Sequence, residues 1–447
     1  PAYLCPLSTN GGTSCSNLSD TTMYAGITTT TLTLNNATLT MNGYGYRLTA
    51  SNSAGSANSN AITLTVTTPA IPGPNGLTID SSGKLYLSDS SNNTIQVITT
   101  AGVATVLAGS AGQQGANDGS AGAALFRQPG GVVLDLSGNL FVADTGNSLI
   151  RKITPNGVVS TFAGSAANQG YHDGNGTAAW FNSPAALAID GAGNLYVADT
   201  GNSVIRKITA TGTVTTVAGT AGSKGSVDGN GAGARFNQPS GIAVDAAGVI
   251  YVSDTFNQTI RRISASGDVS TWVGLQGVSG SADGTEMAAL FNQPAGLALD
   301  ASSGYLSVAD TGNNVIRVIS PAGSVATIAG LSGIAGLMDG IGSQAWFSQP
   351  RDTAWDSAGN LYVTDSGNAA VRKIATNGSV TTLTITASSA TSTPTPPVVT
   401  PPTTTPSSSG PAPGKAGAGS TETWIVAALS VIGTLSRRRK RRSRART

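Results

Sequence analysis

Short apolar runs recur along most of the chain, and turn residues separate each run from the next. In one stretch the runs AALAID, NLYVADT, SVIRKIT and TVTTVAG are divided by GAG, GN and ATG. Each run is too short for a helix and is rich in β-branched residues and tyrosine, a composition that favours strands. The pattern predicts a four-stranded antiparallel meander with tight turns.

The same pattern returns at a fixed interval. Phrases similar to GNLYVADTGNSVIRKI, at residues 193–208, recur at spacings of 55 or 56 residues. Their turn aspartates are Asp89, Asp144, Asp199, Asp254, Asp310 and Asp365. A period of this length indicates a repeat architecture. Six meanders predict a six-bladed β-propeller, because radial packing protects the sheet edges of each blade.

A second repeated phrase connects consecutive blades. One example is YHDGNGTAAWFNSP, at residues 171–184, and its Asp, Phe and final Pro recur with the same period. We expect this crossover phrase to return the chain from the outer strand of one blade to the innermost strand of the next. Its Phe should pack between blades, and its Pro should begin the innermost strand, where a missing N–H is tolerated.

These motifs together resemble the NHL-repeat family, whose members are six-bladed propellers built on a G-N-L-Y-V-A-D-x-x-N-x-x-I-R-K-I unit. The resemblance extends from Pro74 to Ala387. It implies an all-β fold with four-stranded blades over residues 69–387. The sequence departs from the unit at Gln96, which replaces the Arg of blade 1, and at Ala369 and Ala370 in blade 6.

Most carboxylates occupy repeat positions, which favours a structural role for them. Six aspartates precede the turns, six end the innermost strands and five lie in the crossover phrases. Catalysis normally needs one constellation of residues rather than six symmetric copies. We therefore expect Asp199 and its five equivalents to hold turns, with the Arg of the following strand as a partner.

An asymmetric site should lie where one blade differs from the others. The two residues after the repeated Pro are small in most blades, but in blade 6 they are Arg351 and Asp352, followed by Trp355. We expect a ligand site at the channel mouth formed by Asn75, Ser240, Arg351, Asp352 and Trp355. The alternative is that Arg351 and Asp352 plug the channel or pair with each other where the ring closes.

The sequence contains little that would support catalysis or a cofactor. His172 is the single histidine and lies in a crossover phrase, so the sequence contains no histidine zinc cluster and no credible Ser-His-Asp triad. Glycine-rich runs lack the Lys-Ser/Thr of a phosphate loop. We expect no cofactor and no catalytic residue. A metal-dependent hydrolase or lyase acting in the propeller channel remains the alternative, by analogy with other propellers of this kind.

Residues 1–68 do not share the sequence pattern of the repeats. They alternate as strands do, without the 55-residue period. The region resembles the second half of a bacterial immunoglobulin-like domain, with Tyr46 at the tyrosine-corner position and Leu48 where a sandwich cysteine would stand. The resemblance implies a partial immunoglobulin-like β-sandwich that precedes the propeller.

The C-terminal residues divide into a stalk and a tail. Residues 388–420 are rich in Pro, Thr and Ser and predict an extended stalk. Residues 421–447 contain a short apolar segment and end in RRRKRRSRART. This order resembles the C-terminal sorting signals of bacterial surface proteins, and it implies a transient membrane association through the tail.

Charge and module order complete the functional prediction. Eight of the 24 Lys and Arg lie in the last eleven residues, so the rest of the chain is acidic and nucleic acid is not an expected partner. We expect a monomeric bacterial protein, secreted or at the cell surface or outer envelope. It should act as a binding and scaffold protein, with a protein or a carbohydrate as the ligand of its propeller.

Overall fold

The computed structural model describes residues 71–387 continuously and, before them, the backbone of seven short strands. These strands are β1 (Ala2–Cys5), β2 (Ser16–Asn17), β3 (Tyr24–Ala25), β4 (Thr33–Leu34), β5 (Gly45–Asn52), β6 (Gly55–Asn58) and β7 (Ile62–Thr63). β5 pairs with β1, β6 and β7, β1 also pairs with β2, and β3 pairs with β4. The immunoglobulin-like sandwich depends on residues outside the described part, including the side chain of Tyr46, and it stays a prediction. The stalk and the tail also lie outside the described residues.

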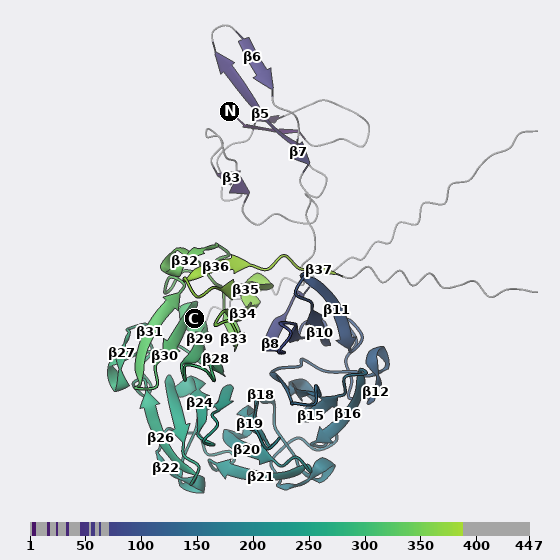
Figure 1. Ribbon diagram of the computed structural model, residues 1–447, viewed down its shortest axis with the longest axis vertical. Coiled ribbons are helices and arrows are strands. Elements are labelled where there is room, and N and C mark those ends of the chain that lie inside the picture. Colours follow the sequence, from purple (N-terminus) through teal and green to yellow (C-terminus); the bar gives the residue numbers. More distant parts are fainter. Residues whose placement is uncertain are drawn as a thin grey trace, which may run out of the picture. The chain divides into compact units, whose positions relative to one another are not determined.

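Residues 71–387 form six sheets arranged radially around a central channel (Figure 1). The strands of blades 1 to 3, from the channel outwards, are β8 (Pro74–Ile79), β9 (Leu85–Asp89), β10 (Thr94–Ile98) and β11 (Val103–Ala108); β13 (Val132–Leu134), β14 (Leu140–Asp144), β15 (Leu149–Ile153) and β16 (Val158–Ala163); β18 (Pro184–Ile189), β19 (Leu195–Asp199), β20 (Val204–Ile208) and β21 (Thr213–Ala218).

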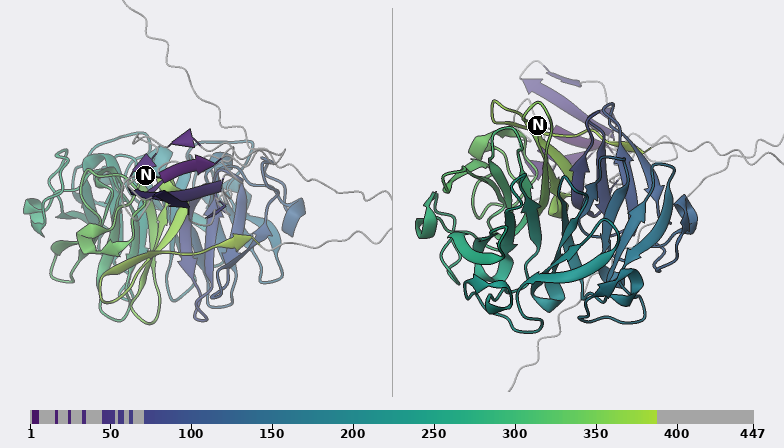
Figure 2. Two further views of the ribbon diagram at one scale, coloured as in Figure 1. Left: turned by 90° about the horizontal axis from the view of Figure 1, so that it is seen from above. Right: turned by 60° about the horizontal axis from the view of Figure 1, so that its bottom comes forward.

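Blades 4 to 6 repeat this arrangement, and the views in Figure 2 show the blade sheets standing across the thickness of the ring. Their strands are β23 (Gly241–Val244), β24 (Ile250–Asp254), β25 (Thr259–Ile263) and β26 (Asp268–Val273); β28 (Pro294–Leu299), β29 (Leu306–Asp310), β30 (Val315–Ile319) and β31 (Ser324–Ala329); β33 (Pro350–Trp355), β34 (Leu361–Asp365), β35 (Ala370–Ile374) and β36 (Ser379–Thr382). The six-bladed propeller predicted from the period is confirmed.

Each blade has one strand more than the four that the sequence predicts. The crossover phrase contributes a two-residue strand that pairs antiparallel with the outer strand of the blade that follows it, as β12 does with β16. These added strands are β12 (Gly119–Ser120), β17 (Gly174–Asn175), β22 (Gly229–Asn230), β27 (Gly284–Thr285) and β32 (Gly340–Ile341). A strand of two residues, one of them glycine, shows no alternating pattern, so these strands could not be predicted from the sequence.

Short 3-10 turns follow two of the repeated elements. One set begins directly after the added outer strands: η2 (Ala121–Ala123), η4 (Gly176–Ala178), η6 (Gly231–Gly233), η8 (Glu286–Ala288) and η10 (Gly342–Gln344). The other set begins directly after the turn aspartates: η3 (Thr145–Asn147), η5 (Thr200–Asn202), η7 (Thr255–Asn257), η9 (Thr311–Asn313) and η11 (Ser366–Asn368). The described residues include no helix long and apolar enough to cross a bilayer.

The ring closes through the last described residues of the chain. β37 (Thr386–Ala387) leaves blade 6 and pairs in parallel with β11 of blade 1, at the place where the crossover strands pair antiparallel in the other blades (Figure 1). Leu383 and Ile385 pack into the apolar cluster between blades 6 and 1. Blade 1 is therefore completed by the opposite end of the propeller sequence.

The hydrophobic core consists of clusters between neighbouring blades. Phe126, from the crossover between blades 1 and 2, is fully buried and packs with Ile95 of blade 1 and Val142 of blade 2. The equivalent Phe of each later crossover is also fully buried. Ile71, three residues before Pro74, joins the cluster between blades 6 and 1. The predicted packing of the repeated Phe between blades is confirmed.

Candidate functional site

The repeated arginine is fully buried in five blades. Both terminal nitrogens of its guanidinium are hydrogen-bonded, whereas its Nε has no hydrogen-bond partner among the described residues. In blade 3, Arg206 donates to Asp199 of the same blade at 3.0 Å and to Asp173 of the preceding crossover at 2.6 Å. It also donates to two backbone carbonyls of that crossover, and its guanidinium carbon lies 5.1 Å from the ring centroid of Phe181. The same ion pairs are made by Arg151, Arg261, Arg317 and Arg372.

The turn aspartates are fully buried acceptors within this network. Besides Arg206, Asp199 accepts the backbone N–H of Asn182 and the side-chain amide of Asn202, both at 2.8 Å. Such a carboxylate has no oxygen free for a ligand or a substrate. In blade 1, Asp89 accepts from Gln96 at 3.3 Å, in the place that Arg takes elsewhere.

In five of the six blades, the residue after the turn aspartate joins one blade to the next. Thr200 donates its hydroxyl to the carbonyl oxygen of Pro239, the last residue of the next crossover phrase, at 2.6 Å. Four other blades make the same bond, including the bond from Ser366 to Pro74 that crosses the closure of the ring. This role was not predicted from the sequence, although the repeated Asp-Thr/Ser pair is a signal for it.

A polar cavity of about 650 Å³ lies at the end of the channel where the innermost strands begin. Asn75, Ser240 and Arg351 line this mouth cavity, as the sequence predicted, together with Gln128 and Gln349 just before the repeated prolines. Arg351 is exposed, and the ion pairs found among residues 71–387 do not include it. It is the one charged side chain among the described residues of the lining.

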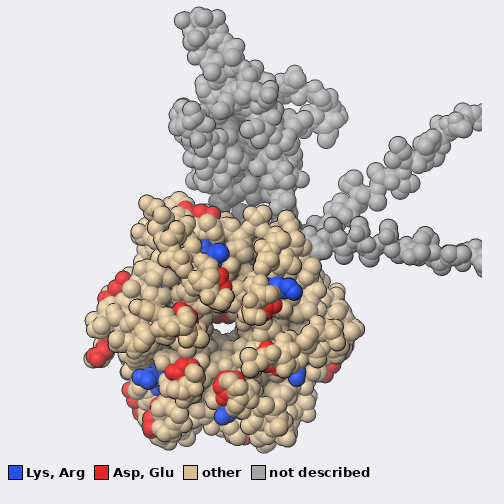
Figure 3. Space-filling model, in the orientation of Figure 1, with Lys and Arg blue, Asp and Glu red and all other residues tan. Residues whose placement is uncertain are grey.

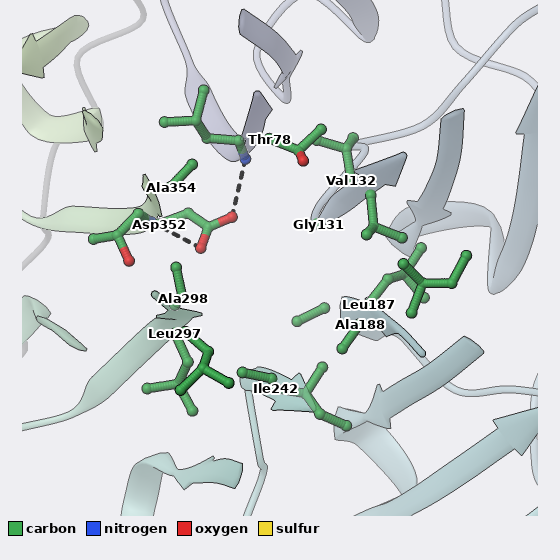
Figure 4. Close-up of a pocket in the computed structure, with 18 of the residues that line it drawn as sticks. Thr78, Gly131, Val132, Leu187, Ala188, Ile242, Leu297, Ala298, Asp352 and Ala354 are labelled. Carbon is green, nitrogen blue, oxygen red and sulfur yellow. Dashed lines mark hydrogen bonds between the residues drawn. The ribbon is translucent and has the colours of Figure 1, made fainter. Parts of the chain in front are cut away.

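The other two predicted residues lie deeper, in the channel cavity of about 260 Å³ lined by the innermost strands. Its walls are mostly aliphatic, and Asp352 carries the one titratable side chain among its described lining residues (Figure 4). The carboxylate of Asp352 accepts the backbone N–H of Leu77 and that of Thr353, each at 2.9 Å. Burial raises the pKa of Asp352 to about 7, although both hydrogen bonds oppose the rise.

The alternative in which Arg351 and Asp352 pair with each other is wrong. No ion pair joins them among the described residues; Arg351 faces the mouth cavity and Asp352 faces the channel cavity. The pairing register of β33 shifts between Pro350 and Asp352, and neighbouring residues of a strand point to opposite sides. The two charged side chains therefore lie in different cavities.

Figure 3 shows the central opening of the ring, with acidic side chains around it.

Trp355 is not at the channel mouth, which corrects its predicted place. It ends β33, and its indole N–H donates to the carbonyl oxygen of Ala298 in blade 5 at 3.2 Å. Ser307 donates to the same carbonyl at 3.0 Å. The other blades have Tyr or Phe at the position of Ser307 and an aliphatic residue at the position of Trp355. At the junction of blades 5 and 6, the large aromatic side chain is therefore on the innermost strand of blade 6 and the small side chain is on β29 of blade 5. The other junctions have the aromatic residue at the position of Ser307.

Phe256 and the single histidine, His172, lie at the surface. Phe256, at the turn of blade 4, is 49% exposed. His172 is exposed in the crossover before blade 3, where its Nδ1 lies 3.1 Å from the carbonyl oxygen of Ala178. Within the described residues, no group of three or more His, Cys, Asp or Glu side chains is placed to hold a metal ion.

Comparison with known sequences identifies the repeats. Three segments, residues 72–98, 126–153 and 236–263, match the model of the NHL repeat, and they fall on blades 1, 2 and 4. The chain is 30% identical over 322 residues to Protein SUPPRESSOR OF QUENCHING 1, chloroplastic, of Arabidopsis thaliana, which covers 68% of this chain and 30% of that protein. It is 34% identical over 282 residues to NHL repeat-containing protein 2 of Gallus gallus, covering 55% and 38%.

The chain thus spans about a third of the length of these curated relatives. Among solved structures, it is similar to an auxiliary nutrient binding protein from Bacteroides ovatus, with a TM-score of 0.51, 18% identity and 70% of each chain covered. At this identity the likeness concerns the fold. The protein is a six-bladed β-propeller that carries NHL repeats.

Proposed function

We propose that this chain is a bacterial binding and scaffold protein, exported or displayed at the cell surface, and that its propeller binds a glycan or protein partner at the mouth cavity. The observation that carries the proposal is the contrast between two sets of polar groups. The repeated Asp side chains and the terminal guanidinium nitrogens of the repeated Arg are buried and bonded within the protein, whereas the mouth cavity presents Arg351 and several amide side chains to solvent.

The size and position of the mouth cavity support this proposal. Its volume of about 650 Å³ lies in the range of small-molecule sites. Blades 1, 4 and 6 contribute Asn75, Ser240 and Arg351, so the propeller scaffold holds these side chains in fixed relation. Two solved propellers similar in fold, from Bacteroides ovatus and Bacteroides thetaiotaomicron, are described as auxiliary nutrient binding proteins, which supports a binding role.

A screen of the full chain on glycan and protein arrays tests the binding proposal. Ser240→Trp places a bulky side chain in the mouth cavity and should abolish binding of any ligand found. Leu136→Trp is the matched control, because Leu136 is 98% exposed in a turn and does not line the mouth cavity. Equal binding by both variants would place the ligand elsewhere.

Location is tested separately by fractionation of cells that express the native gene. Recovery of the protein in the envelope or the medium is expected, and recovery in the cytoplasm alone would contradict the exported assignment. The metal-dependent hydrolase or lyase gains no supporting observation from the described residues, so binding is the one function proposed.

A further inference from the structure

The mouth cavity contains a positive charge that the fold does not use. The ten ion pairs found within residues 71–387 all belong to the repeated arginines, and each of those is fully buried. Arg351 is exposed instead, and no carboxylate is among the described residues that line the cavity. An Arg that takes part in no protein ion pair retains its donors for an anionic group of a ligand.

Five other blades have no charge at the position of Arg351. They present Asn75, Gly130, Ala185, Ser240 and Ala295. All five also line the mouth cavity, so Arg351 extends into a space bounded by small or neutral groups. The channel carboxylate of Asp352 is turned away from this space toward Leu77. The symmetry of the ring is therefore broken by one cation at a single point of the rim.

Amide side chains supply the remaining polar groups of the cavity. Asn75, Gln114, Gln128 and Gln349 line it, and none of their side-chain amides bonds to another residue that the structure describes. Several hydroxyls of the lining are already bonded, as Thr145 is to Pro184. Each free amide offers donors and an acceptor, which suits a ligand with many hydroxyl groups.

We propose that the mouth cavity binds a carboxylate-bearing sugar, with the guanidinium of Arg351 on the carboxylate and the amides on the ring hydroxyls. Guanidinium and carboxylate form short, charge-assisted hydrogen bonds in a fork geometry that a neutral sugar does not supply. The remaining walls are Gly, Ala, Ser, Thr and Pro, which form no deep apolar pocket for a peptide side chain. This inference rests on the proposed function, since it names the ligand class of the same site.

Calorimetric titration of the full chain with trigalacturonic acid and with neutral galactotriose tests the inference. The acidic sugar should bind and the neutral one should bind roughly 10- to 100-fold more weakly. Arg351→Gln should reduce binding of the acidic sugar by a similar factor, whereas Arg351→Lys should retain part of it. Arg262→Gln, which removes an exposed Arg on β25 away from the cavity, should leave binding unchanged.

Three results would overturn the inference. Equal affinity for the acidic and neutral sugars, or unchanged binding by Arg351→Gln, would show that the carboxylate is not recognised at Arg351. Failure of trigalacturonic acid to bind, with another partner captured on the arrays and lost in Ser240→Trp, would reject the acidic sugar and leave the proposed binding function intact. Failure of every ligand on every array would reject both.

Discussion

Asp352 and Leu77 are 275 residues apart in the chain, yet the carboxylate of one accepts the backbone N–H of the other at 2.9 Å. This bond joins the innermost strands of blades 6 and 1, where the ring closes without a crossover phrase. Thr364 and Ser366 of blade 6 also donate to backbone carbonyls at Asn75 and Pro74. Asp352, which has no equivalent carboxylate in the other blades, thus helps to close the ring.

Stability should depend on pH through Asp352. Because its pKa is about 7 in the folded protein and near 3.8 in an unfolded chain, the folded state binds this proton more tightly. Between about pH 4 and 7 the folded state therefore holds more protons, and this contribution to stability falls as pH rises. Asp352→Asn keeps an acceptor for the N–H of Leu77 and should remove this pH dependence. The free energy of unfolding of the variant, relative to that of wild type, should therefore be about 1–3 kcal/mol higher at pH 7.5 than at pH 4.5.

Urea unfolding of both proteins at the two pH values measures this difference. Asp245→Asn, at the end of another innermost strand but held in a local turn, serves as the comparison. If the free energies of unfolding of Asp352→Asn and wild type differed by the same amount at both pH values, that result would contradict a titrating carboxylate in the channel.

Replacement of Asp199 by Ala should lower the free energy of unfolding by about 3–5 kcal/mol, because it leaves the buried guanidinium of Arg206 with one carboxylate instead of two. Asp144→Ala and Asp254→Ala should cost similar amounts, since their networks are the same. Denaturant midpoints of the three variants give the comparison, with exposed Lys224→Ala expected within about 0.5 kcal/mol of wild type. Loss of ligand binding by Asp199→Ala alone, at unchanged stability, would refute the equivalence.

Ser307 and Trp355 should be energetically coupled across the junction of blades 5 and 6. Trp355→Ile alone should cost about 3–5 kcal/mol by leaving a cavity, and Ser307→Tyr alone about 1–3 kcal/mol by overpacking. Together they restore the pair found at the other junctions, such as Tyr251 packed with Leu299. The double variant should lose less than the sum by about 1–3 kcal/mol, as measured by a double-mutant cycle. Simple additivity would show that the two side chains do not compensate.

Removal of the closing strand should destabilise the whole propeller. A stop after Thr382 removes β37 together with Leu383 and Ile385, and should cost about 2–5 kcal/mol through lost apolar burial. A stop after Ala390 keeps these residues and is the matched control. Thermal unfolding compares the two chains, and equal midpoints would mean that the parallel pairing with β11 contributes nothing to closure.

The ring could be predicted because its determinants lie inside every repeat. Phe181, Pro184, Asp199 and Arg206 have equivalents at constant spacing, and one copy explains the others. Closure could not be predicted in the same way. β37 lies beyond the last repeat, and a two-residue strand that pairs with a segment 283 residues away leaves no local pattern.

The candidate site was predicted in part. Asn75, Ser240 and Arg351 could be placed together because they occupy one repeat position near the channel. Asp352 and Trp355 do not line the mouth cavity. Side chains alternate along β33, so Asp352 faces the channel, and Trp355 ends the strand away from the mouth. The exchange of Ser307 with Trp355 was visible in the aligned repeats, but its meaning depends on which blades are neighbours in space.

The arginine network also bears on how such a chain can gain or lose repeats over evolution. Arg206 takes its partners from its own blade and from the crossover that precedes it, never from the blade that follows. A duplicated or deleted segment that begins before a crossover and ends with its blade keeps every buried guanidinium with both carboxylates. A segment shorter or longer than a whole period would separate a guanidinium from one of its carboxylates. Exchange of whole 55-residue periods would therefore preserve the buried network wherever the break points fall, because every crossover carries an equivalent Asp.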